Sequence, residues 1–385
     1  MLRRWIALAL IVGACRGKHR AREDAAPAPP PRAVDAATGF PELASFPRAE
    51  PVRVIALPVR PDVPRFDVGG PVVLGDVAVV ASSQFGFLGV DWRAGHVAWT
   101  KPAGSRVAPP VVVGGSIVLI GECLNAQDVK DTLLGCVRIV TATGADQGYL
   151  AIHGKGVDEF AASPGDQHVW QTGEHQVLWW RGDEAVAVDL MTGVATRARA
   201  EAPPIVVHDK DRAWSLTQDE AGIIHAAGKP TWQTTQAYSK LLGPVYLPGQ
   251  GPMVRAIRAG AFGGHPEINV FDIDATGSMH GQVAFPVPGI GLIGSAIDGV
   301  GDAALAVRLD TSLERDFIAG YAANALLMWV YPLPHQARPD PVGLAIASDA
   351  VVVFHDGDTL TILPELSAPP TAPGAAKPPS ENTTP

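Results

Sequence analysis

The chain has 385 residues, of which 47% are apolar and only 18% are charged. Glycine (41) and proline (35) are both abundant and together make up about a fifth of the chain, where roughly 12% is usual. Because both residues are disfavoured inside helices, this composition speaks against a helical bundle and favours many short strands joined by turns. The net charge of −9 excludes a general nucleic-acid binder, since that function requires a basic face.

The first 15 residues have the pattern of an export signal. Arg3 and Arg4 precede an unbroken apolar run from Trp5 to Cys15, which ends in small residues. As a helix this run would extend about 16 Å, roughly half of the ~30 Å hydrocarbon core of a bilayer. The length therefore excludes a membrane span.

The end of this run, Val12-Gly13-Ala14-Cys15, resembles the lipobox of bacterial lipoproteins. The resemblance implies that residues 1–14 are a signal peptide and that Cys15 is lipidated and becomes the first residue of the mature protein. Ordinary secretion, with a cut after Cys15, is the alternative. Arg16 follows the cysteine where an inner-membrane protein would carry Asp, so we expect a lipid anchor in the outer membrane of the cell envelope, facing the periplasm or the cell surface. The choice between the two membranes stays open.

Two segments have a composition that cannot form a core. Residues 15–50 are rich in Ala and Pro, with Pro27 and Pro29–Pro31 favouring extended polyproline geometry. We interpret them as a tether between the membrane and a folded body. The C-terminal residues 367–385 have a similar composition and are expected to be disordered.

Between residues 51 and 366 short apolar runs alternate with Gly, Pro and Asp turns, which predicts an all-β fold. A unit of about 45 residues recurs in this region, close to the ~40–50 residues typical of β-propeller repeats. Seven units can be traced, and they begin with these apolar strands: Pro71–Leu74, Pro110–Val113, Gln176–Trp180, Pro204–Val207, Gly243–Tyr246, a strand at Gly294, and Pro341–Leu344. The prediction is a seven-bladed propeller of four-stranded antiparallel blades. Eight blades stay open, because Val157–Ser163 could add another strand group.

The last unit contains only three strands, ending at Thr359–Leu363. A fourth strand is available at the other end of the body, in Pro51–Pro58. A ring of blades has exposed edges unless the first and last units join. We therefore predict that the last blade is closed by this N-terminal strand.

Several units share a turn in which Asp is followed four residues later by Gly and then by an aromatic residue. Asp91, Gly95 and Trp99 have this spacing, and Asp189 with Gly193 has its first part. The pattern resembles the PQQ-like (quinoprotein-type) β-propeller repeat, which also occurs in a lipoprotein component of the outer-membrane β-barrel assembly machinery. In physical terms, Asp accepts backbone N–H groups in the turn, Gly supplies a positive φ, and the aromatic ring packs on the neighbouring blade.

The same resemblance raises the question of a quinone-dependent dehydrogenase. Such enzymes are similar to one another in a vicinal Cys-Cys pair at the quinone and a calcium ion held by Glu, Asn and Asp. This chain has three cysteines and no Cys-Cys pair. We therefore predict no enzyme activity, no cofactor and no metal.

Cys123 and Cys136 fall at the end of one predicted strand and the start of the next. An exported protein meets an oxidising compartment, so the expectation is a disulfide that pinches this hairpin and contributes ~3 kcal/mol.

Other motifs receive a structural interpretation. Gly289–Gly294 satisfies G-x-G-x-x-G, but no helix is expected after it to receive a phosphate. The Asp pairs are expected in turns: Asp209/Asp211, Asp272/Asp274 and Asp356/Asp358. The histidines fall about one per turn, which suits the surface: His96, His153, His208, His265 and His355. Trp179 and Trp180 must point to opposite faces of a strand, so one of the two rings could be exposed.

These features together predict a lipid-anchored, non-catalytic, monomeric propeller that acts as a protein-binding scaffold. Its expected partners are envelope proteins and, through the anchor, the membrane, with no nucleic acid. A propeller that binds a small molecule or glycan at the mouth of its channel is the second hypothesis, and an enzyme whose residues converge there from several blades is the third.

Overall fold

The computed structural model describes residues 46–60, 68–103, 107–123, 133–154, 167–181, 184–198, 205–209, 212–227, 232–233, 237, 240–247, 251–262, 265–273, 279–286, 291–297, 302–310, 315–322, 326–333 and 342–366. These residues form strands and turns only, with no helix among them. None of them therefore belongs to a helix long and apolar enough to cross a membrane.

The strands form seven four-stranded antiparallel sheets, the blades, numbered here in chain order and given from the inner strand outward. Blade 1 is β2 (Val68–Leu74), β3 (Val77–Ser82), β4 (Gly86–Asp91) and β5 (His96–Lys101); blade 2 is β6 (Val111–Val113), β7 (Ser116–Gly121), β8 (Leu133–Val140) and β9 (Asp146–His153). Blade 3 is β10 (Gln167–Gly173), β11 (Gln176–Arg181), β12 (Glu184–Asp189) and β13 (Ala195–Ala198); blade 4 is β14 (Ile205–Asp209), β15 (Arg212–Gln218), β16 (Ile224–Ala227) and β17 (Trp232–Gln233). Blade 5 is β18 (Lys240–Leu247), β19 (Gly251–Phe262), β20 (His265–Ile273) and β21 (Met279–Pro286). Blade 6 is β22 (Gly291–Ile297), β23 (Ala303–Asp310), β24 (Arg315–Tyr321) and β25 (Leu327–Pro332); blade 7 is β26 (Gly343–Ile346), β27 (Ala350–His355), β28 (Thr359–Pro364) and β1 (Arg53–Ala56).

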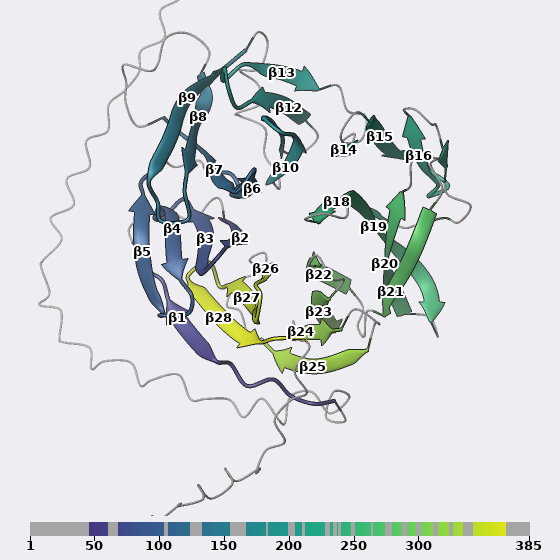
Figure 1. The fold of residues 1–385 in the computed structure, drawn as a ribbon. Helices are drawn as coiled ribbons and strands as arrows, with labels where there is room; N and C mark the ends of the chain where they lie inside the picture. Colours follow the sequence, from purple (N-terminus) through teal and green to yellow (C-terminus); the bar gives the residue numbers. More distant parts are fainter. Residues whose placement is uncertain are drawn as a thin grey trace, which may run out of the picture.

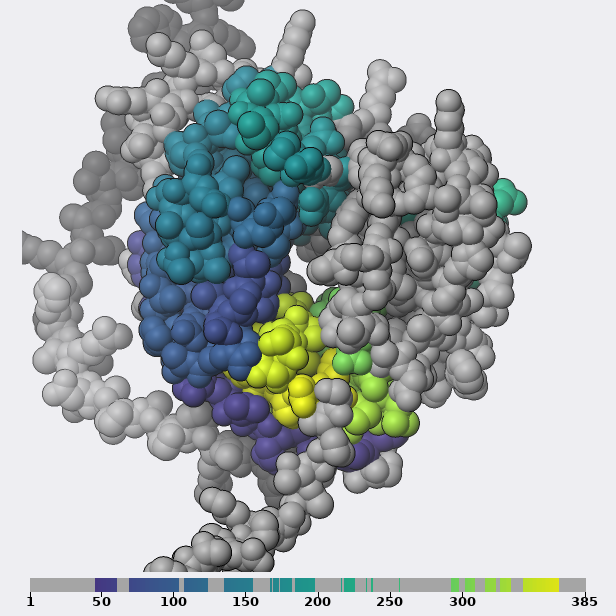
Figure 2. Space-filling model, in the orientation of Figure 1, coloured from purple at the N-terminus to yellow at the C-terminus, as the bar shows by residue number. Residues whose placement is uncertain are grey.

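The blades are arranged in a ring around a central channel, with the first strand of each blade innermost (Figure 1). The space-filling view shows the opening at the centre of this ring (Figure 2). The predicted all-β propeller of four-stranded antiparallel blades is confirmed, with seven blades among the described residues. Val157–Ser163, the segment on which an eighth blade depended, lies outside them.

The predicted closure of the ring is also confirmed. β1 pairs with β28 in an antiparallel register that joins Arg53 to Ile362 and Ala56 to Thr359. Buried Ile55 and Leu57 then pack into the cluster between blades 7 and 1. The two ends of the folded body are therefore held in one sheet, about 300 residues apart in sequence.

The N-terminal segment extends further along the rim than the sequence analysis allows. Ala49 N–H donates to the Val330 carbonyl at 2.9 Å, and Val330 N–H donates to the Pro47 carbonyl at 2.8 Å. Ala49 is buried in the cluster between blades 6 and 7. Residues 47–49, which belong to the predicted tether (residues 15–50), thus lie against the outer strand of blade 6 before the chain closes blade 7.

The core is a series of apolar layers between neighbouring blades. Val118, Ile120 and Val137 of blade 2 share one such layer with Val177 and Val186 of blade 3, and all five side chains are fully buried. The apolar alternation of each strand supplies one face to each neighbour.

The inner strands approach one another closely around the channel, which explains why glycine stands at two positions of these strands. A Cβ atom added to Gly294 would lie 2.5 Å from the Val342 carbonyl oxygen of blade 7, and one added to Gly343 would collide with the Gly70 carbonyl of blade 1. Only glycine fits where two backbones meet in this way.

The Asp, Gly and Trp residues of the repeat occupy the roles expected of them. Asp91 accepts the Ala94 N–H at 2.7 Å, and Gly95 adopts a φ of 80°. Trp99 lies opposite Gly89 on the neighbouring strand and donates its Nε1–H to the Ala142 carbonyl of blade 2 at 2.8 Å.

Blade 6 repeats this arrangement. Trp329 lies opposite Gly320 and donates to the Glu365 carbonyl of blade 7 at 3.3 Å. In both blades a ring lying over a strand glycine joins one blade to the next.

Candidate functional site

The residues that the sequence analysis assigned to specific chemistry are the three cysteines. Cys123 and Cys136 are joined by a disulfide with a Cα–Cα distance of 5.1 Å, and the bond ties the end of β7 to β8. Cys15 lies outside the described residues, as do the signal peptide, most of the tether and the C-terminal tail.

A cleft opens between blades 1 and 2 beside this disulfide. It spans about 290 Å³, most of which is open to solvent. Side chains from β4, β5, β7, β8 and β9 line it, and we call it the blade 1–2 cleft. Its principal members are Phe87, Lys101, Leu119, Glu122, Arg138 and Tyr149.

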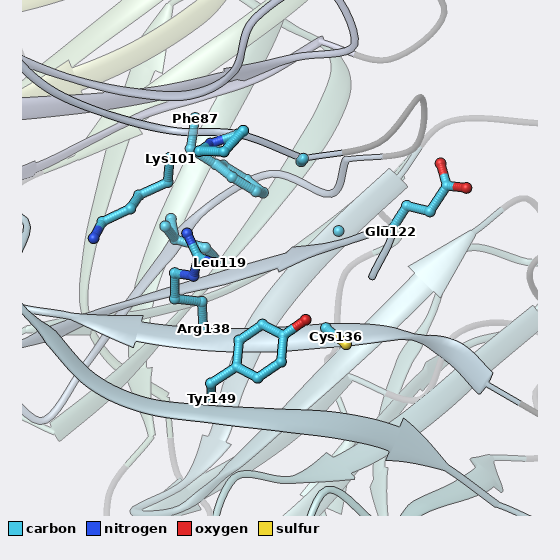
Figure 3. A pocket seen from close by; sticks show the side chains of 10 residues that line it. Phe87, Lys101, Leu119, Glu122, Cys136, Arg138 and Tyr149 are labelled. Carbon is cyan, nitrogen blue, oxygen red and sulfur yellow. The ribbon is translucent and has the colours of Figure 1, made fainter. Parts of the chain in front are cut away.

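The cleft has a cationic end and an apolar floor. Lys101 Nζ lies 3.0 Å from Asp146 Oδ2, and Arg138 Nε lies 3.7 Å from Asp146 Oδ1, so two cations share one carboxylate. The Arg138 guanidinium lies over the Tyr149 ring at 5.5 Å from its centroid. Figure 3 shows Phe87 and Lys101 on one side and Arg138 and Tyr149 on the facing strands, with the Glu122 carboxylate at the opposite end of the cleft from Lys101.

Sequence reasoning missed this cleft. Lys101, Arg138 and Tyr149 come from three strands of two blades. Their spacing contains no motif, and only the ring brings them together.

A second surface feature runs along the outer edges of blades 6 and 7. Val52 and Val54 are 69% and 57% exposed, Phe46 is 36% exposed, and Leu326, just before β25, is 58% exposed. We call these four residues the rim patch. Figure 2 shows the purple N-terminal segment following the rim beneath the yellow strands of blade 7. Val54 lies on β1 and Val52 directly precedes it, so the outer edge of blade 7 exposes apolar surface here.

His355 differs from the prediction that it lies at the surface. Its side chain is buried (2% exposed), with Nδ1 at 2.9 Å from Asp356 Oδ2 and Nε2 at 2.9 Å from Thr361 Oγ1. The imidazole lies at the end of β27, where the hairpin to β28 folds over it.

The Asp356 carboxylate, the His355 imidazole and the Thr361 hydroxyl are hydrogen-bonded in the same sequence of groups as in a hydrolytic triad. However, Thr361 is only 1% exposed, so its hydroxyl is shielded from any substrate. Tyr331 of blade 6 also hydrogen-bonds Thr361, and burial raises the pKa of that tyrosine. These hydrogen bonds therefore link blade 7 to Tyr331 on the outer strand of blade 6.

The remaining motifs are structural where they can be seen. Gly291–Gly294, the second part of the G-x-G-x-x-G motif, lies in β22, which no helix follows within the described residues. Asp356 and Asp358 lie in the turn between β27 and β28, as predicted. Asp209 ends β14 and Asp272 lies within β20, whereas their partners Asp211 and Asp274 lie outside the described residues. Within the described part of the chain no group of three or more His, Cys, Asp or Glu side chains could hold a metal ion.

The adjacent tryptophans of blade 3 point to opposite faces, as predicted. Trp179 is buried in the layer shared with blade 2, and its Nε1–H donates to Gln167 Oε1 at 3.1 Å. Trp180 is half-buried and stacks on Trp170 at 6.4 Å between ring centroids.

No family model and no curated protein match the sequence. Solved structures with a similar arrangement include a chain of a mitotic checkpoint complex (12% identity, TM-score 0.47, 92% of this chain and 99% of that chain). The β-propeller domain of Myceliophteria thermophila Cps50 (Swd1) matches at 11% identity and a TM-score of 0.49, over 78% of this chain and all of that one. BamB from Moraxella catarrhalis matches at 12% identity and a TM-score of 0.37, over 82% of this chain and all of that one. At these values the assignment of the propeller fold is based on the strand topology described above.

Proposed function

We propose that this protein is a lipid-anchored, non-catalytic β-propeller scaffold that binds other proteins in the bacterial cell envelope. The anchor is Cys15, and the PQQ-like repeat is the repeat class to which we assign the blades. The ring is the rigid body that presents the binding surface.

The rim patch is the observation that carries this proposal. Val52 and Val54 are exposed at the outer edge of blade 7, Phe46 is exposed at the start of the segment that runs along the outer strand of blade 6, and Leu326 is exposed just before that strand. A rigid closed ring loses little conformational freedom when it binds, so apolar contact on its surface contributes more fully to affinity. An extended or flat partner surface fits this rim better than a small molecule does, since a ligand pocket is concave.

The assignment to the PQQ-like repeat is supported by the two Trp-on-Gly contacts. Trp99 and Trp329 each cover a glycine of the neighbouring strand and donate to the backbone of the next blade. The expected spacing from Asp to Gly is present in the turns of blades 1 and 3.

The proposal is tested by the double variant Val52→Asp/Val54→Asp in the full-length, membrane-bound protein. Both side chains are exposed, so the fold should tolerate the change. The matched control is Ala98→Asp, at an exposed position on β5, the outer strand of blade 1. We expect proteins that co-purify from detergent-solubilised envelopes to fall at least tenfold in yield with the double variant and to be retained with the control. The same partners at the same yield from all three proteins would contradict the proposal.

A further inference from the structure

We propose that the blade 1–2 cleft binds an acidic segment of a partner protein, with one carboxylate held between Lys101 and Arg138. This inference rests on the proposed scaffold function and gives it a second contact site with a defined ligand chemistry.

The charge arrangement at the cationic end favours a second carboxylate. Lys101 and Arg138 are 16% and 24% exposed, whereas Asp146, which lies beside both, is 56% exposed. Among the described residues, two partly buried cations thus meet one largely solvated anion at this end, while the other lining acid, Glu122, lies at the opposite end of the cleft (Figure 3). Because partial burial lowers the effective dielectric, the excess positive charge of this end acts more strongly than it would on an open surface. The protein as a whole carries a net charge of −9, so this end of the cleft is a local exception.

The surfaces beside the cations suit an apolar or aromatic neighbour of that carboxylate. Tyr149 is 40% exposed with Arg138 over its ring, while Phe87 and Leu119 are buried beneath. Tyr and Arg are enriched where proteins bind one another. The ligand chemistry is thus an Asp or Glu next to a large apolar side chain.

The shape of the cleft favours contact with a partner lying across it over enclosure of a free small molecule. Most of its volume of about 290 Å³ is open solvent, and the enclosed part has room for about one water molecule. Sites that enclose small molecules are concave and bury most of the ligand surface, so a side chain that reaches the cleft from a partner at its mouth fits the geometry better.

The walls are preorganised for binding. The Cys123–Cys136 disulfide ties the two strands that form one wall. Gly121 pairs directly with Cys136, and a Cβ atom added to Gly135 would lie 2.7 Å from the Gly121 carbonyl oxygen. A fixed wall reduces the ordering cost of binding.

The test uses the mature protein in detergent micelles and a fluorescein-labelled peptide, Gly-Phe-Asp-Glu-Phe-Gly, followed by fluorescence anisotropy. The comparison peptide has Asn-Gln in place of Asp-Glu. We expect the acidic peptide to bind at least tenfold more tightly, and Lys101→Met and Arg138→Gln each to weaken it about three- to tenfold. Arg197→Gln, which removes a rim cation paired with Glu184 on blade 3, is the matched control and should leave binding unchanged.

The decisive variant is Asp146→Asn, which removes the competing carboxylate. If the cleft binds carboxylates, this change should increase the affinity for the acidic peptide by about threefold. A purely structural ion pair predicts no increase in affinity. Equal binding of the two peptides, or unchanged or weaker binding to Asp146→Asn, would overturn the inference. If succinate displaces the peptide and binds with an affinity equal to that of the peptide, the inference would also be overturned, because the ligand would then be a free small carboxylate. If the peptide test fails in one of these ways but co-purification of partners still depends on Val52 and Val54, the cleft is not a binding site and the proposed scaffold function is unaffected.

Discussion

Arg93 of blade 1 and Asp349 of blade 7 form a two-pronged ion pair across the junction where the ring closes, although 256 residues separate them. Arg93 Nη1 and Nη2 lie 2.5 and 2.7 Å from the two carboxylate oxygens of Asp349, and Arg93 Nε lies 2.6 Å from Asp76. The guanidinium also lies 4.3 Å above the Trp92 ring. The junction between blades 7 and 1 is therefore joined by this ion pair as well as by the β1–β28 strand pairing that closes the ring.

Replacement of Asp349 by Asn should produce an acid-dependent loss of stability. The Arg93 guanidinium lowers the pKa of Asp349, so the stabilisation is present above the usual Asp pKa of about 4 and is lost as the pH falls through the lower, folded value. Because both side chains are exposed, we expect the Tm of Asp349→Asn to be only about 1–2 °C below wild type at pH 7. Thermal melts of the two proteins should converge once the pH falls below the lowered pKa of Asp349. A constant difference from pH 7 down through this range would contradict the ion-pair account, and Glu174→Gln on blade 3 is the exposed control.

Stepwise N-terminal truncation separates tether, rim segment and closing strand. A protein that begins at Phe46 should melt like the mature protein, since the Ala/Pro-rich tether cannot form a core. A start at Pro51 should lower the Tm, because Val330 loses two backbone hydrogen bonds and buried Ala49 is removed. A start at Pro58 should lower it much further and cause aggregation, since the edge of β28 is then uncovered. Equal melting of the last two proteins would mean that β1 does not close the ring.

The Trp-on-Gly contact predicts that Gly89→Ala is destabilising. A Cβ atom at this position would collide with the Trp99 ring, and overpacking of this kind costs about 1–3 kcal/mol. Gly148→Ala is the matched control, because its Cβ would meet Ile139 at an ordinary 3.7 Å. Denaturant unfolding should show the loss for Gly89→Ala only, and equal unfolding midpoints would contradict the proposed packing.

Replacement of Cys15 by Ser tests the anchor. If the cysteine is lipidated, the variant should leave the membrane fraction or accumulate as an uncleaved precursor, since acyl chains contribute ~0.8 kcal/mol per buried CH₂. Cell fractionation and mobility on denaturing gels provide the measurement. Unchanged membrane association and unchanged mobility would exclude a lipoprotein.

Most of the ring could be predicted from the sequence, because each blade repeats the same local signals. The closing strand was found from a missing fourth strand, and the Asp–Gly turns from their spacing. The first strand of blade 3 is not predicted: Gln167–Gly173 has only Val169 and Trp170 as large apolar residues, so the sequence pattern places the start of that unit at Gln176–Trp180.

The features that escaped prediction depend on contacts between blades. In the sequence His355 resembles a turn residue. It is buried because the β27–β28 hairpin brings Asp356 and Thr361 within hydrogen-bonding distance of its imidazole. The pairing of Pro47 and Ala49 with Val330 joins residues about 280 positions apart and has no local signal. The blade 1–2 cleft likewise exists only once the ring has assembled.

The central claim, that the rim patch binds a protein partner, is tested most directly by photocross-linking in intact envelopes. A benzophenone amino acid at position 54 should give discrete cross-linked protein bands, and the same group at position 98 on blade 1 should not. Both positions are exposed on outer strands, so they differ in location rather than in accessibility. Discrete bands from position 54 alone are the result we predict. No protein band from position 54, or the same bands from both positions, would contradict the scaffold function.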